Sequence, residues 1–165
     1  MQEQGTTEQQ KKPTEVIKER LQAHVDLIRE YENQCERLER LTASMTAPKA
    51  QTYDGMPGGT PESDPMALQV ARKIELEENI AHLLKVIRYD EGKIDAIIKQ
   101  LDNAEERCIL RLRYIDAEDW VDVAWIQYHK KKDYKRNTSG YLKRAYNKHG
   151  EALAHLAEIE APEAS

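Results

Sequence analysis

The chain of 165 residues contains no phenylalanine, only two cysteines and no long apolar run, and its mean hydropathy is -0.82. A membrane-spanning helix needs about 20 mainly apolar residues, and a secretory leader needs an apolar stretch that the N-terminal MQEQGTTEQQKKP lacks. We therefore predict a cytoplasmic protein with no membrane partner. An apolar content of only 39% also disfavours a sheet-centred fold around one large core.

The two cysteines, Cys35 and Cys108, stand far apart in helix-like segments, each without a second cysteine or a paired histidine nearby. This spacing is typical of reduced, packed thiols rather than of a disulfide framework or a zinc site. The histidines also lack metal-ligand spacing (His24, His82, His129, His149 and His155). We predict neither a metal nor a cofactor, and we interpret His24 and His149, which fall on apolar stripes, as satisfied packing positions.

A single glycine-rich stretch, YDGMPGGTPESDP at 53–65, is the candidate for a phosphate-binding loop. Such a loop needs a preceding strand and a Lys-Ser/Thr pair after its last glycine. Here Gly59 is followed by Thr-Pro-Glu, without a lysine and with a carboxylate that repels phosphate. The stretch is therefore a linker or turn. No Ser, Cys or His lies in a nucleophile-elbow context, and we predict that the protein is not an enzyme.

Charge and helical periodicity are what the sequence has in abundance, with 33% of residues charged. After a disordered lead-in at 1–13, Thr14 can cap a long helix. The seam of this helix alternates at 4-3 spacing (Ile17, Leu21, His24, Ile28, Tyr31, Cys35, Leu38, Thr42 and Met45).

A second long helix is predicted to begin at Asp64-Pro65, an N-cap followed by a first-turn proline. Its predicted seam has weak points at Glu91 and Gly92 (Met66, Val70, Ile74, Ile80, Leu84, Ile87, Ile94, Ile98 and Leu101). Residues 14–101, with a Gly/Pro linker at 47–64, are therefore either an antiparallel helical hairpin or an oligomeric coiled coil. The pattern does not choose between them, and we expect a homo-oligomer through this hairpin.

Three shorter helices are predicted in the region 102–157, ahead of a polar tail at 158–165. Asn103 can cap the first, with Glu106 as its capping-box partner, and Asp119 can cap the second. The last helix is expected to begin near Thr138 or Ser139 as its cap. The fold class is thus all-α, a coiled-coil-like hairpin followed by a helix-turn-helix-like region.

The segment from Tyr128 to His149 carries eight Lys or Arg and one Asp in a chain of net charge -5. If the final helix enters a major groove, one face presents side chains that can bond base edges (Ser139, Lys143, Arg144 and Asn147). Other cations would contact phosphates (Lys130, Lys131, Lys132, Lys135, Arg136 and Lys148). The alternative is a solvated basic face, or one that pairs with the acidic hairpin of the same chain.

Three stretches resemble one known family: LRLRYID at 110–116 with Trp120 after it, HGEAL at 149–153, and the DGMP-Gly-Gly and Ser-Asp-Pro linker. They are similar to ArpU/RinA-like transcription regulators of phages and prophages of Gram-positive bacteria, which have a sigma-70-region-4-like helix-turn-helix. The resemblance covers roughly residues 15–156. It implies binding of double-stranded DNA in a bacterial host cell, a role in late-gene transcription, and RNA polymerase as a further partner.

The predicted core of the helix-turn-helix draws on all three short helices (Ile109, Leu112, Ile115, Trp120, Val123, Ala124, Leu142, Tyr146, His149 and Leu153). The chain departs from the family between Trp120 and His149, where a basic insertion at about 128–139 lengthens the turn. That insertion is either an extra arm on DNA or a disruption of the motif. Two other functions stay open: a small-terminase-like component of DNA packaging, and a coiled-coil adaptor that binds no DNA.

Overall fold

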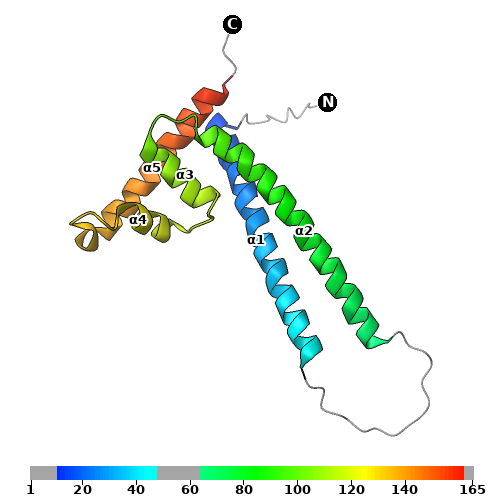
Figure 1. The fold of residues 1–165 in the computed structure, drawn as a ribbon. Helices are drawn as coiled ribbons and strands as arrows, with labels where there is room; N and C mark the ends of the chain where they lie inside the picture. The colour runs from blue at the N-terminus through cyan, green and yellow to red at the C-terminus, as the bar shows by residue number, and fades with distance from the viewer. Residues whose placement is uncertain (1–10, 48–63, 162–165) are drawn as a thin grey trace, which may run out of the picture. The chain divides into compact units, whose positions relative to one another are not determined.

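The computed structural model describes residues 11–47 and 64–161, and within these ranges every regular element is a helix (Figure 1). The two long helices are α1 (Pro13–Thr46) and α2 (Pro65–Ile98). The shorter elements are α3 (Ala104–Tyr114), α4 (Trp120–Tyr128), the 3-10 turn η1 (Tyr134–Arg136) and α5 (Thr138–Glu160). The prediction of an all-α fold with a long N-terminal helical hairpin is confirmed. The glycine-rich stretch, most of the lead-in and the end of the tail lie outside the described residues.

The chain divides into two compact units, the head and the arm. The head comprises residues 1–26 and 90–165, and thus the start of α1, the end of α2 and all the shorter helices. The arm comprises residues 27–89, and thus the rest of α1 and α2. Neither boundary coincides with the predicted one near residue 101, because the ends of both long helices carry side chains that belong to the core of the head.

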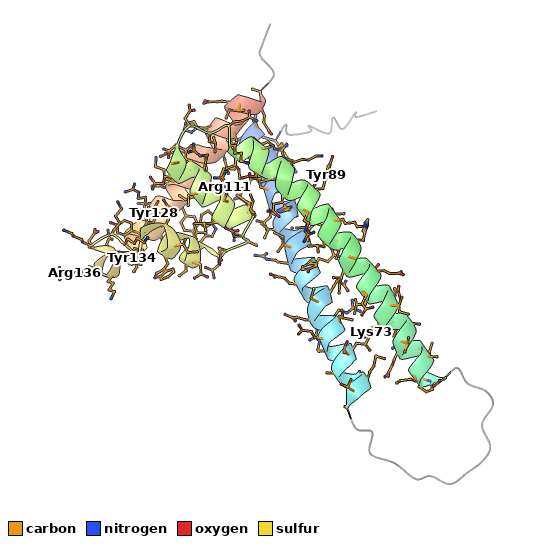
Figure 2. All side chains as sticks on the ribbon, viewed as in Figure 1. Lys73, Tyr89, Arg111, Tyr128, Tyr134 and Arg136 are labelled. Carbon is orange, nitrogen blue, oxygen red and sulfur yellow. The ribbon has the colours of Figure 1, made fainter. Side chains whose placement is uncertain are left out.

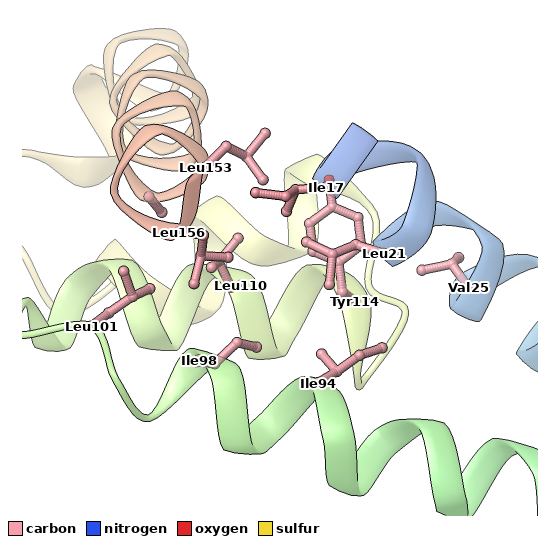
Figure 3. Packing of buried hydrophobic residues seen from close by; sticks show 11 residues of the cluster. Ile17, Leu21, Val25, Ile94, Ile98, Leu101, Leu110, Tyr114, Leu153 and Leu156 are labelled. Atoms are coloured by element: carbon pink, nitrogen blue, oxygen red, sulfur yellow. The ribbon is translucent and has the colours of Figure 1, made fainter. Parts of the chain in front are cut away.

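Two clusters of buried apolar side chains hold the head together. The first joins α1, α2, α3 and α5, as Figure 3 shows (Ile17, Leu21, Val25, Ile94, Ile98, Leu101, Leu110, Tyr114, Ala152, Leu153 and Leu156). The second lies among α3, α4, η1 and α5 (Ile109, Val123, Ala124, Tyr128, Tyr134 and Ala145). Burial of a large aliphatic side chain contributes about 1.5–3 kcal/mol, so these clusters dominate the stability of the head.

Helix starts follow the predicted capping residues at three of five positions. The Asn103 side chain accepts from the backbone N–H of Glu105 at 2.8 Å, and Asp119 accepts from Val121 at 2.9 Å. Asp64 caps α2 by accepting from Met66 at 3.0 Å. The predicted cap residues of the other two helices are wrong. Helix α1 already begins at Pro13, ahead of Thr14, and α5 begins at Thr138 as expected but has Asn137 at its N-cap.

Glu106 has a different role from the predicted capping-box partner. Its side chain is buried, and its Oε2 lies 2.8 Å from Nδ1 of His155 on α5. The carboxylate therefore ties α3 to α5, and this contact raises the pKa of His155.

The two seam histidines differ from each other. His149 is satisfied, since its Nε2 lies 2.7 Å from the Tyr114 hydroxyl. His24 is 2% exposed, yet neither of its ring nitrogens has a hydrogen-bond partner among the described residues. Burial therefore lowers the pKa of His24, against the raising effect of Asp90 and Glu91, and the prediction of a satisfied packing position is wrong for it.

The predicted seam of α2 holds only for its C-terminal part. Ile87, Ile94 and Ile98 are buried, whereas Met66, Val70 and Ile74 are 45%, 41% and 50% exposed. The apolar spacing therefore continues into the N-terminal part of α2, where the described chain leaves these side chains exposed.

Gly92 offers a test of helix α2 at its predicted weak point. The helix runs through this residue, and a Cβ there meets no atom within 4 Å. We expect Gly92→Ala to raise the free energy of unfolding by about 0.5–1 kcal/mol in urea titrations, because alanine loses less backbone entropy in a helix. Gly140→Ala is the control: its Cβ falls 2.3 Å from the Asn137 side chain, so no comparable gain is expected there.

Candidate nucleic-acid interface

The first half of α5 packs through one face onto α3 and α4. Ala145 on this face is fully buried in the second cluster, and Leu142 packs against the same cluster. Helix α4 brings Val123 and Ala124 to it, and α3 brings Ile109. The three helices thus form one small unit around a shared core, in agreement with the predicted positions of these residues, and the opposite face of α5 is left to solvent.

The solvent face of α5 presents three of the four predicted base-reading side chains. Ser139, Lys143 and Asn147 are exposed and recur at four-residue spacing, so they lie along one side of the helix, which we call the reading face after the role predicted for it. Tyr146 lies on the same side and is 45% exposed, although the sequence placed it in the core. Its ring packs on Trp120 with the ring centroids 4.6 Å apart, which fixes an aromatic edge on this side of the helix.

Arg144, the fourth predicted reader, points to a different side of α5. Its guanidinium forms a two-pronged ion pair with Glu105 of α3, with distances of 2.9 and 3.0 Å, and lies over the ring of Tyr128. The Tyr128 hydroxyl donates to the same carboxylate at 2.5 Å. The Arg144 hydrogen bonds lower the pKa of Glu105, as expected for a carboxylate held by a cation. Arg144 therefore joins α5 to α3 and does not belong to the reading face.

The basic insertion is an ordered connection between α4 and α5, which we call the basic tip (residues 129–136). Tyr134 of η1 is buried in the second cluster, and its ring centroid lies 5.5 Å from that of Tyr141. The Tyr141 ring in turn lies 5.1 Å from the ring of Tyr128. Asp133 accepts from the Tyr141 hydroxyl at 2.6 Å. The tip therefore adds a buried side chain to the second cluster.

The cations of the basic tip all remain exposed (Lys130, Lys131, Lys132, Lys135 and Arg136). In Figure 2, Arg136 lies farther out on the head than Tyr128 and Tyr134. The one acid in this segment, Asp133, is engaged by Tyr141, and the tip leads directly into the first turn of α5. Positive charge is thereby concentrated next to Ser139 and Lys143.

Lys148 differs from the other predicted phosphate contacts. Its side chain is 24% exposed and forms an ion pair with Glu151 on the same helix. That hydrogen bond raises the pKa of Lys148. The side chain is thus paired within the protein, unlike the exposed cations of the basic tip.

Trp120 contacts side chains of α3 and α5 next to the reading face. Besides Tyr146, its ring contacts the His149 ring edge-on at 4.9 Å and lies beneath the guanidinium of Arg113, 5.3 Å from the centroid. Arg113 also donates to the carbonyl of Glu118 at 2.7 Å. These contacts hold the start of α4 against α5, the relation that a helix-turn-helix needs.

His149 and Tyr114 form the polar centre of the head. Burial raises the pKa of Tyr114 to about 12 and lowers the pKa of His149 to about 4, with Lys18 and Arg113 adding to the effect on the histidine. Both groups are therefore uncharged at neutral pH. Three predicted core residues remain: Ile115 and Leu153 pack in the first cluster, and Leu112 packs against the second.

Other kinds of site are not apparent in the described part of the chain. No group of three or more His, Cys, Asp or Glu is placed to hold a metal ion among residues 11–47 and 64–161. None of the described helices is long and apolar enough to span a bilayer. No protein-family model, no curated protein and no solved structure matches the chain.

Proposed function

We propose that the protein is a non-enzymatic DNA-binding regulator of transcription, of the phage and prophage type that its sequence resembles. One observation carries the proposal: a three-helix unit leaves a face of α5 uncovered, and this face begins beside five exposed cations. Lysine can donate to guanine acceptors and asparagine can bond adenine in two places, so Lys143 and Asn147 are suited to base edges. Tyr146 adds an aromatic edge that suits contact with a thymine methyl group.

In this proposal the basic tip contacts phosphates on either side of the groove. Lysine and arginine contacts to phosphate release counterions and supply affinity that does not depend on sequence. The acidic remainder of the chain restricts this attraction to one end of the head, since the net charge of the whole protein is -5. RNA polymerase as a second partner belongs to the same proposal and rests on the family resemblance alone.

The salt dependence of binding tests the assignment of the tip. We expect the wild-type protein to bind duplex DNA in fluorescence anisotropy titrations, with an affinity that falls steeply as salt rises. Lys130→Ala combined with Lys131→Ala is expected to lower the slope of log K against log salt by about 2, since each phosphate contact contributes about 0.9.

Lys12→Ala combined with Lys18→Ala is the matched control, because these two lysines are exposed on α1 and its approach and lie outside the tip. This variant keeps the same chain charge as the tip variant. If both variants lowered the slope equally, binding would follow net charge, and the tip would have no specific role. If the wild-type protein bound no duplex at low salt, the proposed function would be wrong.

A further inference from the structure

The arm fully buries very few of its apolar side chains. Among its described residues Ile87 is the single buried hydrophobic side chain, at 7% exposure. The α1 seam positions that belong to the arm are half-buried at best, including Ile28, Leu38 and Met45. Two helices of this length gain little stability from their own hydrogen bonds, and a structure this small rarely supplies a sufficient core alone.

An uncovered apolar stripe runs along α2 in this unit, formed by Met66, Val70 and Ile74. The three side chains follow at four-residue spacing, so they lie along one side of the helix, and each is at least 41% exposed. Leu68, at 47%, is two residues from both Met66 and Val70 and lies on the opposite side of the helix. Exposure of such a stripe to water is unfavourable in free energy, and packing against a partner helix removes the apolar surface from water.

The charges of the arm are also largely unpaired. Arg37, Arg40 and Arg72 line a cleft between α1 and α2 together with Glu75. None of these three arginines forms a salt bridge within the described residues, where the arm has one such pair, Lys73 with Glu77 at 3.7 Å.

Carboxylates on the same unit are likewise without cationic partners in the described chain, among them Glu32, Glu36 and Glu39 of α1. The described arm has seven basic and eight acidic residues. A surface with both signs in nearly equal number is poorly suited to a polyanion such as DNA, and it is complementary to a copy of itself.

We propose that the arm pairs with the arm of a second copy of this chain, so that the stripe Met66–Val70–Ile74 is covered across the interface. A two-fold pairing presents the same stripe from both copies, as closed dimers require. It also brings the second copy's glutamates within reach of the unpaired arginines. The heads are not part of this interface, so the proposal is independent of DNA binding.

Sedimentation equilibrium of the full-length protein tests this proposal. The wild-type chain is expected to sediment at twice its mass of 19.1 kDa at micromolar concentration. Val70→Glu combined with Ile74→Glu is expected to weaken self-association by roughly 100-fold or more, because the carboxylates become desolvated at the interface. Circular dichroism should show that the variant keeps its helices, since both positions are exposed in the single chain.

Val16→Glu is the matched control, since Val16 is 52% exposed but lies in the head. This variant should remain a dimer. A wild-type protein that stays monomeric up to roughly 100 µM would overturn the proposal. So would a double variant that stays dimeric, or a wild-type mass of a large ring. Retained binding of the monomeric double variant to duplex DNA would separate the arm from the function of the head.

Discussion

Lowering the pH from 7 to 5 is expected to reduce the free energy of unfolding of the head by about 2 kcal/mol through His149 alone. The pKa of this side chain is about 4 in the folded protein and about 6.5 in the unfolded chain. Between these values the unfolded state binds the proton and the folded state does not. Stability is therefore lost as the pH falls through 6.5, and the loss is complete near pH 4.

The structural cause is the lack of a place for positive charge at His149. Its Nε2 is held by the Tyr114 hydroxyl, the edge of Trp120 packs against its ring, and the nearby charges of Lys18 and Arg113 repel a proton. A protonated ring would lose water without gaining a carboxylate. Urea titrations at intervals from pH 7 to pH 5 measure the effect above the range in which the carboxylates titrate.

Two variants isolate the contribution of His149. His149→Gln keeps a polar group opposite Tyr114 but does not titrate, so its stability should be lower at pH 7 and its loss of stability below pH 6.5 should be smaller by about 2 kcal/mol. The loss that remains is due to His24, whose pKa is also lowered by burial. His155→Gln is the control, because the contact with Glu106 raises the pKa of His155. That contribution is present below 6.5 and is lost as the pH rises through the folded pKa, so this variant should keep the acid-side loss. An unchanged acid slope in His149→Gln would contradict the assignment.

Much of the fold follows from the sequence because helices are encoded locally. The 3.6-residue periodicity predicts all five helices, and Asn103, Asp119 and Asp64 predict where three of them begin. The seam of α2 is wrong at Met66, Val70 and Ile74, since periodicity shows which face is apolar but not whether the same chain covers it.

The candidate site could be predicted less completely, because its residues are distinguished by distant partners. Lys143 and Arg144 are adjacent cations, but only Arg144 turns toward Glu105, which lies 39 residues earlier. Tyr146 fits the apolar spacing of α5 and was assigned to the core, although its place beside Asn147 on the helix offers a second interpretation. Local patterns do not record such contacts across the fold.

These neighbours provide the most direct test of the reading face. Lys143→Ala is expected to lower the ratio of specific to non-specific DNA affinity by about 5- to 150-fold, the equivalent of the 1–3 kcal/mol of one good base contact. The wild-type protein first selects its preferred sequence from random duplexes. Fluorescence anisotropy then gives the affinity of each variant for the selected and a scrambled duplex at one salt concentration.

Arg144→Ala is the matched control, since it removes the same charge one residue away. We expect this variant to lower the melting temperature, because Glu105 and the Tyr128 hydroxyl lose their shared cation on a partly buried surface. Its specificity ratio should stay close to that of the wild type. If Arg144→Ala lowered the ratio and Lys143→Ala did not, DNA binding would have to break the ion pair with Glu105, and the reading face would be rotated toward α3. A ratio unchanged in both variants would show that α5 does not read bases through this part of the helix.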